Sequence, residues 1–183
     1  MTALKTYLPT LAKDLGKSTE KFNEWLRALV AGKALLPRPG RGPGSGVELT
    51  AKSLATFLLA LLASDFRNHA VELAKMLCKA KPTKYRRCPV TGADNLRDAI
   101  AIGLEGRGLL DSKTGSLWQI IVFRGRGVAT LYWRMADGEI LPIAFSTTNE
   151  IANDLFAVDA VLHGAAVEKI VSDLKLLNQD LAK

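Results

Sequence analysis

The sequence predicts an α+β protein, in which a helical N-terminal part is followed by a small three-stranded antiparallel sheet packed by helices. Up to about residue 79, apolar residues recur with the 3.6-residue period of amphipathic helices. From residue 117 onward, this period gives way to short runs rich in β-branched and aromatic residues. Helices first and paired strands afterwards are typical of the α+β class.

Two short helices joined by a tight turn begin the chain. Thr6 can cap the first helix, Pro9 is tolerated in its first turn, and Gly16 ends it. Ser18 or Thr19 can cap the second helix. The apolar residues of that helix follow the i, i+3, i+4, i+7, i+8 pattern and are Phe22, Trp25, Leu26, Leu29 and Val30.

A segment without regular structure follows, because seven of the ten residues at 37–46 are Gly or Pro. Beyond it, Thr50 suits the N-cap of a helix over residues 51–63. That helix is apolar nearly all round, so we expect it to be central or sandwiched between subunits. A further helix is predicted over residues 65–79.

The basic, turn-rich segment at residues 81–92 is expected to be a linker between two structural units. It divides the chain into a helical domain, residues 1–80, and an α+β domain, residues 93–183. A short helix over about residues 95–104 is expected to open the second domain.

Three β-rich runs separated by tight turns form the predicted antiparallel meander. The runs are residues 117–124, 128–135 and 139–146. Pro142 lacks a backbone donor, so we expect the third strand at the edge of the sheet. A sheet of three strands must cover one face, and the final helix, about residues 159–182, is the expected cover.

Charge is distributed unevenly along the chain, whose formal net charge is +7. Residues 1–90 hold 16 Lys and Arg against 6 Asp and Glu, a net charge of +10. Residues 91–183 hold 9 against 12, a net charge of −3. Such asymmetry is expected when one part of a chain meets nucleic acid and the other does something else. The alternative is uneven surface charge without a partner.

The order of elements in the first half resembles the winged helix-turn-helix of bacterial and phage regulators, over roughly residues 4–63. The resemblance is carried by residues 11–18, 25–29 and 35–37, followed by the Gly-rich loop. It implies that the second helix, about residues 18–31, enters the major groove while the loop, or wing, reaches the neighbouring backbone or minor groove. The implied contacts are Ser18, Thr19, Lys21, Asn23, Glu24 and Arg27 on the helix, Lys17 near a phosphate, and Arg38 and Arg41 in the wing. This wing is longer and looser than a tight hairpin, and the alternative is an ordinary helical bundle with a flexible loop.

A second basic cluster lies around Tyr85 in the predicted linker. Its charges are typical of a contact with a nucleic-acid backbone, and the alternative is a solvated linker. The residues predicted to contact DNA there are Lys84, Arg86 and Arg87.

Neither a metal site, a cofactor site nor a catalytic site is predicted. The Gly-rich segments lack the spacing of phosphate-binding loops. Cys78 and Cys88 lie ten positions apart without a second pair, which differs from the close pairs of structural zinc sites. Asp65 and His69 are four positions apart on one predicted helix, where a local ion pair is expected rather than an acid–base pair. The sequence therefore predicts a protein that is not an enzyme.

The leading hypothesis is a DNA-binding transcriptional regulator that reads duplex DNA as a homodimer. Pairing is expected through the apolar helix at residues 51–63 or the final helix at residues 159–182. The second half would then mediate dimerisation, sense a ligand, or contact RNA polymerase or another protein. The alternative is a protein-interaction module, an adaptor or inhibitor from a mobile element or phage, whose basic surface binds an acidic partner or occupies a nucleic-acid channel.

Location in the cytoplasm, away from membranes, is also expected. The longest apolar run, residues 54–63, is about half of what a membrane-spanning helix needs. Residues 1–20 lack the pattern of a signal peptide, and two cysteines do not make a disulfide framework.

Overall fold

The computed structural model describes residues 2–38, 46–106, 115–124, 126–148 and 159–180. Over these residues the chain forms six helices and one antiparallel sheet of five strands, which confirms the α+β class. The helices are α1 (Leu4–Asp14), α2 (Thr19–Ala31), α3 (Ala51–Ala63), α4 (Arg67–Cys78), α5 (Leu96–Leu104) and α6 (Gly164–Asp180). The strands are β1 (Lys81–Pro82), β2 (Ser116–Phe123), β3 (Val128–Arg134), β4 (Ile140–Ser146) and β5 (Asp159–Leu162).

The sheet has the order β1-β4-β3-β2-β5, so the prediction of three strands was wrong. The predicted meander is present as β2, β3 and β4. One extra strand pairs at each side of it, β1 against the end of β4 and β5 against β2. A strand of two residues has no periodicity to detect. The residues of β5 had been assigned to the start of the final helix, which begins only at Gly164.

Pro142 in β4 lies opposite Tyr132 of β3. The pairs between β4 and β1 are formed by Phe145 and Ser146 alone, so β1 does not pair with β4 at Pro142. Strand β4 is therefore not the edge strand over its whole length, but it is unpaired on the β1 side at Pro142. The absence of a backbone N–H at this proline is tolerated there.

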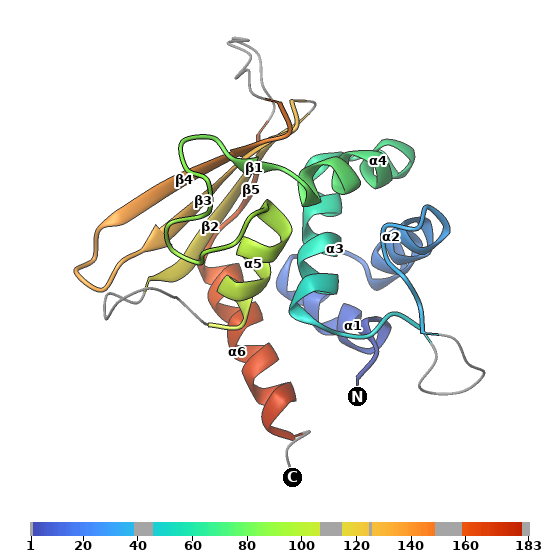
Figure 1. Ribbon diagram of the computed structural model, residues 1–183. Coiled ribbons are helices and arrows are strands. Elements are labelled where there is room, and N and C mark those ends of the chain that lie inside the picture. Colours follow the sequence, from blue (N-terminus) through green and yellow to red (C-terminus); the bar gives the residue numbers. More distant parts are fainter. Residues whose placement is uncertain (1, 39–45, 107–114, 125, 149–158, 181–183) are drawn as a thin grey trace.

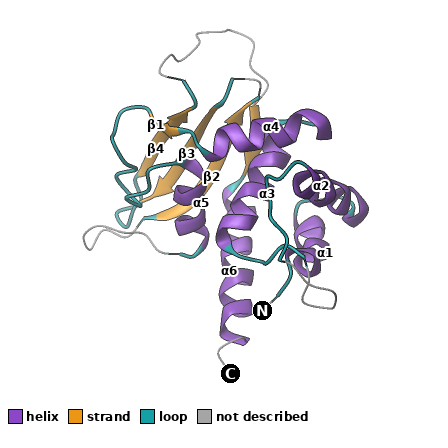
Figure 2. Cartoon of the chain, turned by 45° about the vertical axis from the view of Figure 1, so that its right-hand side comes forward, coloured by secondary structure: helices purple, strands orange, loops and turns teal. Residues whose placement is uncertain are grey.

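All the helices lie on one side of the sheet (Figure 1). In this view and in the rotated one (Figure 2), α5, α6 and α3 are next to the sheet, while α1, α2 and α4 form an outer layer. The sheet residues that face the helices are fully buried and include Ile120, Leu131, Trp133, Ile143 and Phe145. The core therefore lies between the sheet and the helical layer.

Helix α3 lies at the centre of this core, which is one of the two positions that its apolar sequence predicted. Eleven of its 13 residues are buried by the rest of the same chain. It starts with the predicted cap, because Thr50 Oγ1 accepts a hydrogen bond from Ser53 N and Ser53 Oγ accepts one from Thr50 N. The apolar surface of α3 is therefore largely covered within the chain, and pairing through residues 51–63 stays a prediction.

Helix α1 begins earlier than predicted, with Ala3 rather than Thr6 at its N-cap. Leu4 is completely buried, and its backbone N donates to Val47 O over 2.8 Å. This tertiary contact fixes the start of the helix, so Pro9 lies inside α1 rather than in its first turn.

The segment at residues 81–92 is attached to the fold near both of its ends. Lys81 and Pro82 form β1, Thr83 N donates to Ala144 O, and Cys88 and Val90 are buried. One continuous apolar core includes residues from both sides of this segment. The division into two domains stays a prediction.

Candidate nucleic-acid interface

The turn between α1 and α2 is fixed by its backbone. Gly16 has φ +61°, a conformation that favours glycine, and Lys17 N donates back to Ala12 O over 2.8 Å. Ser18 then caps α2, because its Oγ accepts a hydrogen bond from Lys21 N at 3.1 Å. This arrangement places Lys17 and Lys21 at the N-terminal end of α2.

After α2, the described residues Arg38 and Gly46 lie next to each other and run antiparallel. Arg38 N donates to Gly46 O over 3.0 Å, which forms an isolated antiparallel bridge. A second bridge joins Glu48 to Ala3, just before α1. Arg38 also forms an ion pair with Glu48, with 2.5 Å between Nη2 and Oε2. Arg41 lies outside the described residues.

The exposed side of α2 and of the turn before it carries both signs of charge, because Glu20 and Glu24 are exposed there as well as three cations. Lys17, Lys21 and Arg27 are exposed, and within the described part of the chain they form no ion pair. Glu24 on the same helix is paired with Arg67 of α4, with 3.1 Å between Oε2 and Nη1. The opposite face of α2 packs into the core through Phe22, Trp25, Leu26 and Leu29.

Three other predicted contacts on α2 are less available. Asn23 is half-buried, and its Oδ1 is enclosed without a hydrogen-bond partner among the described residues. Thr19 is also half-buried, and the Ser18 hydroxyl is occupied as the helix cap. The helical period alone did not reveal how far the neighbouring elements cover Asn23.

The second basic cluster does not join this surface. Lys84, Arg86 and Arg87 are exposed, and Arg87 Nε pairs with Asp94 Oδ1 at 2.8 Å. Their segment, between β1 and α5, lies beside the sheet, whereas α2 lies at the other side of the molecule in both views (Figures 1 and 2). The predicted contacts therefore form two separate surfaces.

Sequence reasoning missed a pocket behind the N-terminal end of α2. It has a volume of about 270 Å³, and α2 meets the end of α3, the end of β2 and strand β5 there. The Arg124 side chain is three-quarters buried and lines this pocket. No sequence pattern could predict this placement, because Asp65, the ion-pair partner of Arg124, is 59 positions away in the chain.

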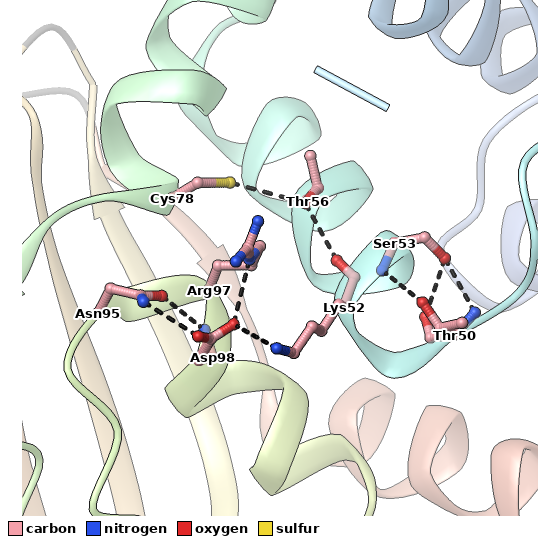
Figure 3. Close-up of polar contacts among 8 residues, drawn as sticks. All are labelled: Thr50, Lys52, Ser53, Thr56, Cys78, Asn95, Arg97 and Asp98. Atoms are coloured by element: carbon pink, nitrogen blue, oxygen red, sulfur yellow. Dashed lines mark hydrogen bonds and ion pairs between the residues drawn. The ribbon is translucent and has the colours of Figure 1, made fainter. Parts of the chain in front are cut away.

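Polar side chains between α3 and α5 bind one another and so join the two helices, and they are not arranged as a catalytic site (Figure 3). The Asp98 carboxylate accepts hydrogen bonds from Asn95 Nδ2 at 3.1 Å and Arg97 Nε at 3.2 Å, and lies 3.4 Å from Lys52 Nζ. Nearby, the Cys78 thiol contacts Thr56 Oγ1 at 3.6 Å. Burial raises the pKa of this thiol, which keeps it protonated and unreactive at neutral pH.

No protein-family model, no curated protein and no solved structure matches the chain. Among the described residues, no three or more His, Cys, Asp or Glu side chains are grouped as metal ligands would be. No helix in the described ranges combines the length and the hydropathy needed to cross a membrane.

Proposed function

We propose that this protein is a DNA-binding transcriptional regulator, which reads duplex DNA with α2 and the wing after it. The observation that carries the proposal is the exposure of Lys17, Lys21 and Arg27, on α2 and the turn before it, between Gly16 and the antiparallel bridge of Arg38 with Gly46. A helix-turn-helix followed by a wing uses this order of elements to dock on DNA.

Lys17, Lys21 and Arg27, which form no ion pair with the described residues, would contact different parts of the DNA. Lys17, at the N-terminal end of α2, suits a phosphate, because backbone N–H groups there also favour an anion. Arg27 carries a planar guanidinium that can donate two parallel hydrogen bonds to guanine O6 and N7 in the major groove. Lys21 lies between them on the helix and adds to the attraction for the phosphate backbone.

We also propose that two copies pair through α6. Helix α3 is covered within the chain, whereas α6 exposes Leu176, whose exposed fraction is 58%. Pairing would give two half-sites, which raises affinity over that of one module. A Leu176→Glu variant should shift the mass measured by light scattering from dimer to monomer. A monomeric wild-type protein would reject this part of the proposal.

The experiment that tests DNA binding compares two variants of equal charge. Duplexes are first selected from a random library on the wild-type protein and then titrated by fluorescence anisotropy. Lys21→Ala with Arg27→Ala removes two positive charges from α2, and Lys84→Ala with Arg86→Ala removes two from the other surface. Since a base contact contributes about 1–3 kcal/mol, the α2 variant should bind the selected duplex roughly 30-fold more weakly. The control should change affinity less than about 3-fold.

Equal losses in the two variants would reject recognition through α2, since they would indicate attraction by net charge alone. Circular dichroism on both variants checks that the fold is intact. The failure of any sequence to be enriched during selection would reject a sequence-reading regulator altogether.

A second candidate function, a protein-interaction module, is favoured by the outer face of the sheet. In the described part of the chain no helix covers that face (Figure 1). The side chains that alternate with the buried ones there are largely apolar and include Ile121, Phe123, Tyr132, Pro142 and Ala144. Binding to every duplex alike, lost together as salt rises, would favour this candidate.

A further inference from the structure

The pocket behind α2 combines apolar walls with a cationic edge. Its walls are formed by Leu15, Phe22, Trp25, Leu61, Leu62, Ala160, Val161 and Leu162. Its polar residues are Lys17, Lys21, Ser64, Asp65 and Arg124. Such a mixture, mostly apolar with few polar groups, is typical of sites for small molecules.

Among the described residues that line this pocket, Asp65 carries the only carboxylate, and this carboxylate is ion-paired. Asp65 accepts two hydrogen bonds from the Arg124 guanidinium, one of them 3.1 Å from Nη2 to Oδ1. Arg124 Nε also donates to Leu62 O over 3.1 Å. Arg124 and Asp65 therefore cancel each other's charge, and Lys17 and Lys21 leave the lining with a surplus of two positive charges. That surplus favours an anion.

Trp25 supplies an independent observation. Its side chain lines the pocket and is only 3% exposed, yet its indole Nε1 is buried without a hydrogen-bond partner among the described residues. A buried donor without an acceptor costs about 1–3 kcal/mol, so such groups usually have a partner in the functional state. Because Nε1 is enclosed rather than open to the pocket, an acceptor atom on a bound molecule would become that partner once the Trp25 ring shifts.

We propose that this pocket binds a small organic anion with an apolar body. Its carboxylate or sulfonate group pairs with Lys17 and Lys21, and its apolar part packs against Phe22, Leu62 and Trp25. A volume of about 270 Å³ is just below the usual range of ligand pockets, so the occupant is a compact molecule with one or two rings or a short acyl chain.

Binding in this pocket has a consequence for DNA. Lys17 and Lys21 are also two of the three cations that we assign to the DNA-binding face. An anion that neutralises them lowers the affinity for phosphate, so the molecule acts as an inducer that releases DNA. This consequence rests on the proposed function, whereas the pocket itself does not.

The test uses the full chain without DNA. Benzoate, 2-naphthoate and octanoate are titrated beside their neutral amides, and binding is followed by calorimetry and by the NMR signal of the Trp25 indole N–H. We expect at least one anion to shift this signal and to bind at least 10-fold more tightly than its amide. Lys17→Gln with Lys21→Gln should weaken anion binding at least 10-fold, and Ala160→Leu, which fills the pocket, should abolish it. Lys13→Gln, on the exposed side of α1 outside the pocket, is the matched control and should bind like the wild type.

Several outcomes would overturn the proposal. They are an absence of binding for all six probes up to 10 mM, equal binding of anions and amides, and binding that persists in the Lys17→Gln, Lys21→Gln protein. Because this test contains no DNA, its result is separate from that of the DNA titration. Anion binding without DNA binding would support the anion site and reject the proposed DNA-binding function. DNA binding without anion binding would support the DNA-binding function and reject the anion site.

Discussion

The Arg124 guanidinium and the Asp65 carboxylate form a two-armed ion pair that joins the end of β2 to the segment between α3 and α4. The same guanidinium donates through Nε to Leu62 O at the C-terminal end of α3. The last carbonyl groups of a helix lack partners within it and attract cations. Helix α3 has no basic residue in its own last turn, so a distant strand supplies the positive charge.

Replacing this cation should destabilise the fold. Arg124→Gln should lower the free energy of unfolding by about 1–2 kcal/mol, because a partly buried charged hydrogen bond and an ion pair are both lost. Asp65→Asn should cost less, under about 1 kcal/mol, since the Asp65 side chain is 70% exposed and the bond to Leu62 O remains. Urea unfolding measures both, with Arg86→Gln as the exposed control. Equal stability of Arg124→Gln and wild type would show that the contacts of Arg124 with Asp65 and Leu62 O contribute nothing to the free energy of unfolding.

A close contact between α5 and the sheet gives a second prediction. A Cβ added at Gly103 would lie 2.8 Å from Leu117 Cβ and 3.0 Å from Trp133 Cη2. Gly103→Ala should therefore lower the free energy of unfolding by about 1–3 kcal/mol, although alanine is the better helix former. Ser172→Ala, at an exposed position of α6, should change it by less than about 0.5 kcal/mol. A stabilised Gly103→Ala protein would mean that α5 can move away from the sheet at little cost.

The lowered pKa of Asp98 predicts that the stability of the fold depends on pH. Burial raises the pKa of Asp98, but the hydrogen bond from Asn95 and the charges of Arg97 and Lys52 outweigh burial, so the pKa lies below its usual value. A lowered pKa in the folded state means that the carboxylate stabilises the fold above the unfolded value, about 4, and that this contribution is lost as pH falls below it.

Asp98→Asn should consequently be less stable than wild type by about 1 kcal/mol at pH 7 and equally stable near pH 2. Urea unfolding at pH 7, 5, 4 and 3 follows the convergence. Asp137→Asn, in an exposed turn, controls for the general effect of removing a carboxylate. A difference that stays constant across these pH values would contradict the electrostatic origin.

Local signals predicted α2 and α3 best, because both helices begin at residues whose side chains cap them. The sequence offered Thr50 as one N-cap and Ser18 or Thr19 as the other, and the side chains of Thr50 and Ser18 accept the expected hydrogen bonds. The start of α1 was missed because Leu4 is held by Val47, a contact between distant residues. Edge strands β1 and β5 were missed for the same reason, since their pairing partners lie far along the chain.

The candidate site was predicted in part for related reasons. Exposure of Lys21 and Arg27 follows from the period of α2, whereas the enclosure of Asn23 depends on tertiary packing. The pocket behind α2 could not be predicted, because the elements that line it come together only in the folded chain. Local capping and periodicity therefore place single side chains, and long-range pairing decides which of them share a surface.

Neutralising one or the other partner of the ion pair between Arg38 and Glu48 should change the affinity for DNA in opposite directions. These residues lie at the base of the predicted wing, where Glu48 offsets the charge of Arg38. If this base approaches the phosphate backbone, Glu48→Gln should raise the affinity for random duplex DNA about 2- to 5-fold, and Arg38→Gln should lower it by a similar factor. The double variant should bind like the wild type, since its net charge at the base is the same. Fluorescence anisotropy between about 50 and 200 mM salt measures these affinities, and the differences should shrink as screening increases. An unchanged affinity of Glu48→Gln at the lowest salt would place the wing away from DNA and leave α2 as the sole contact.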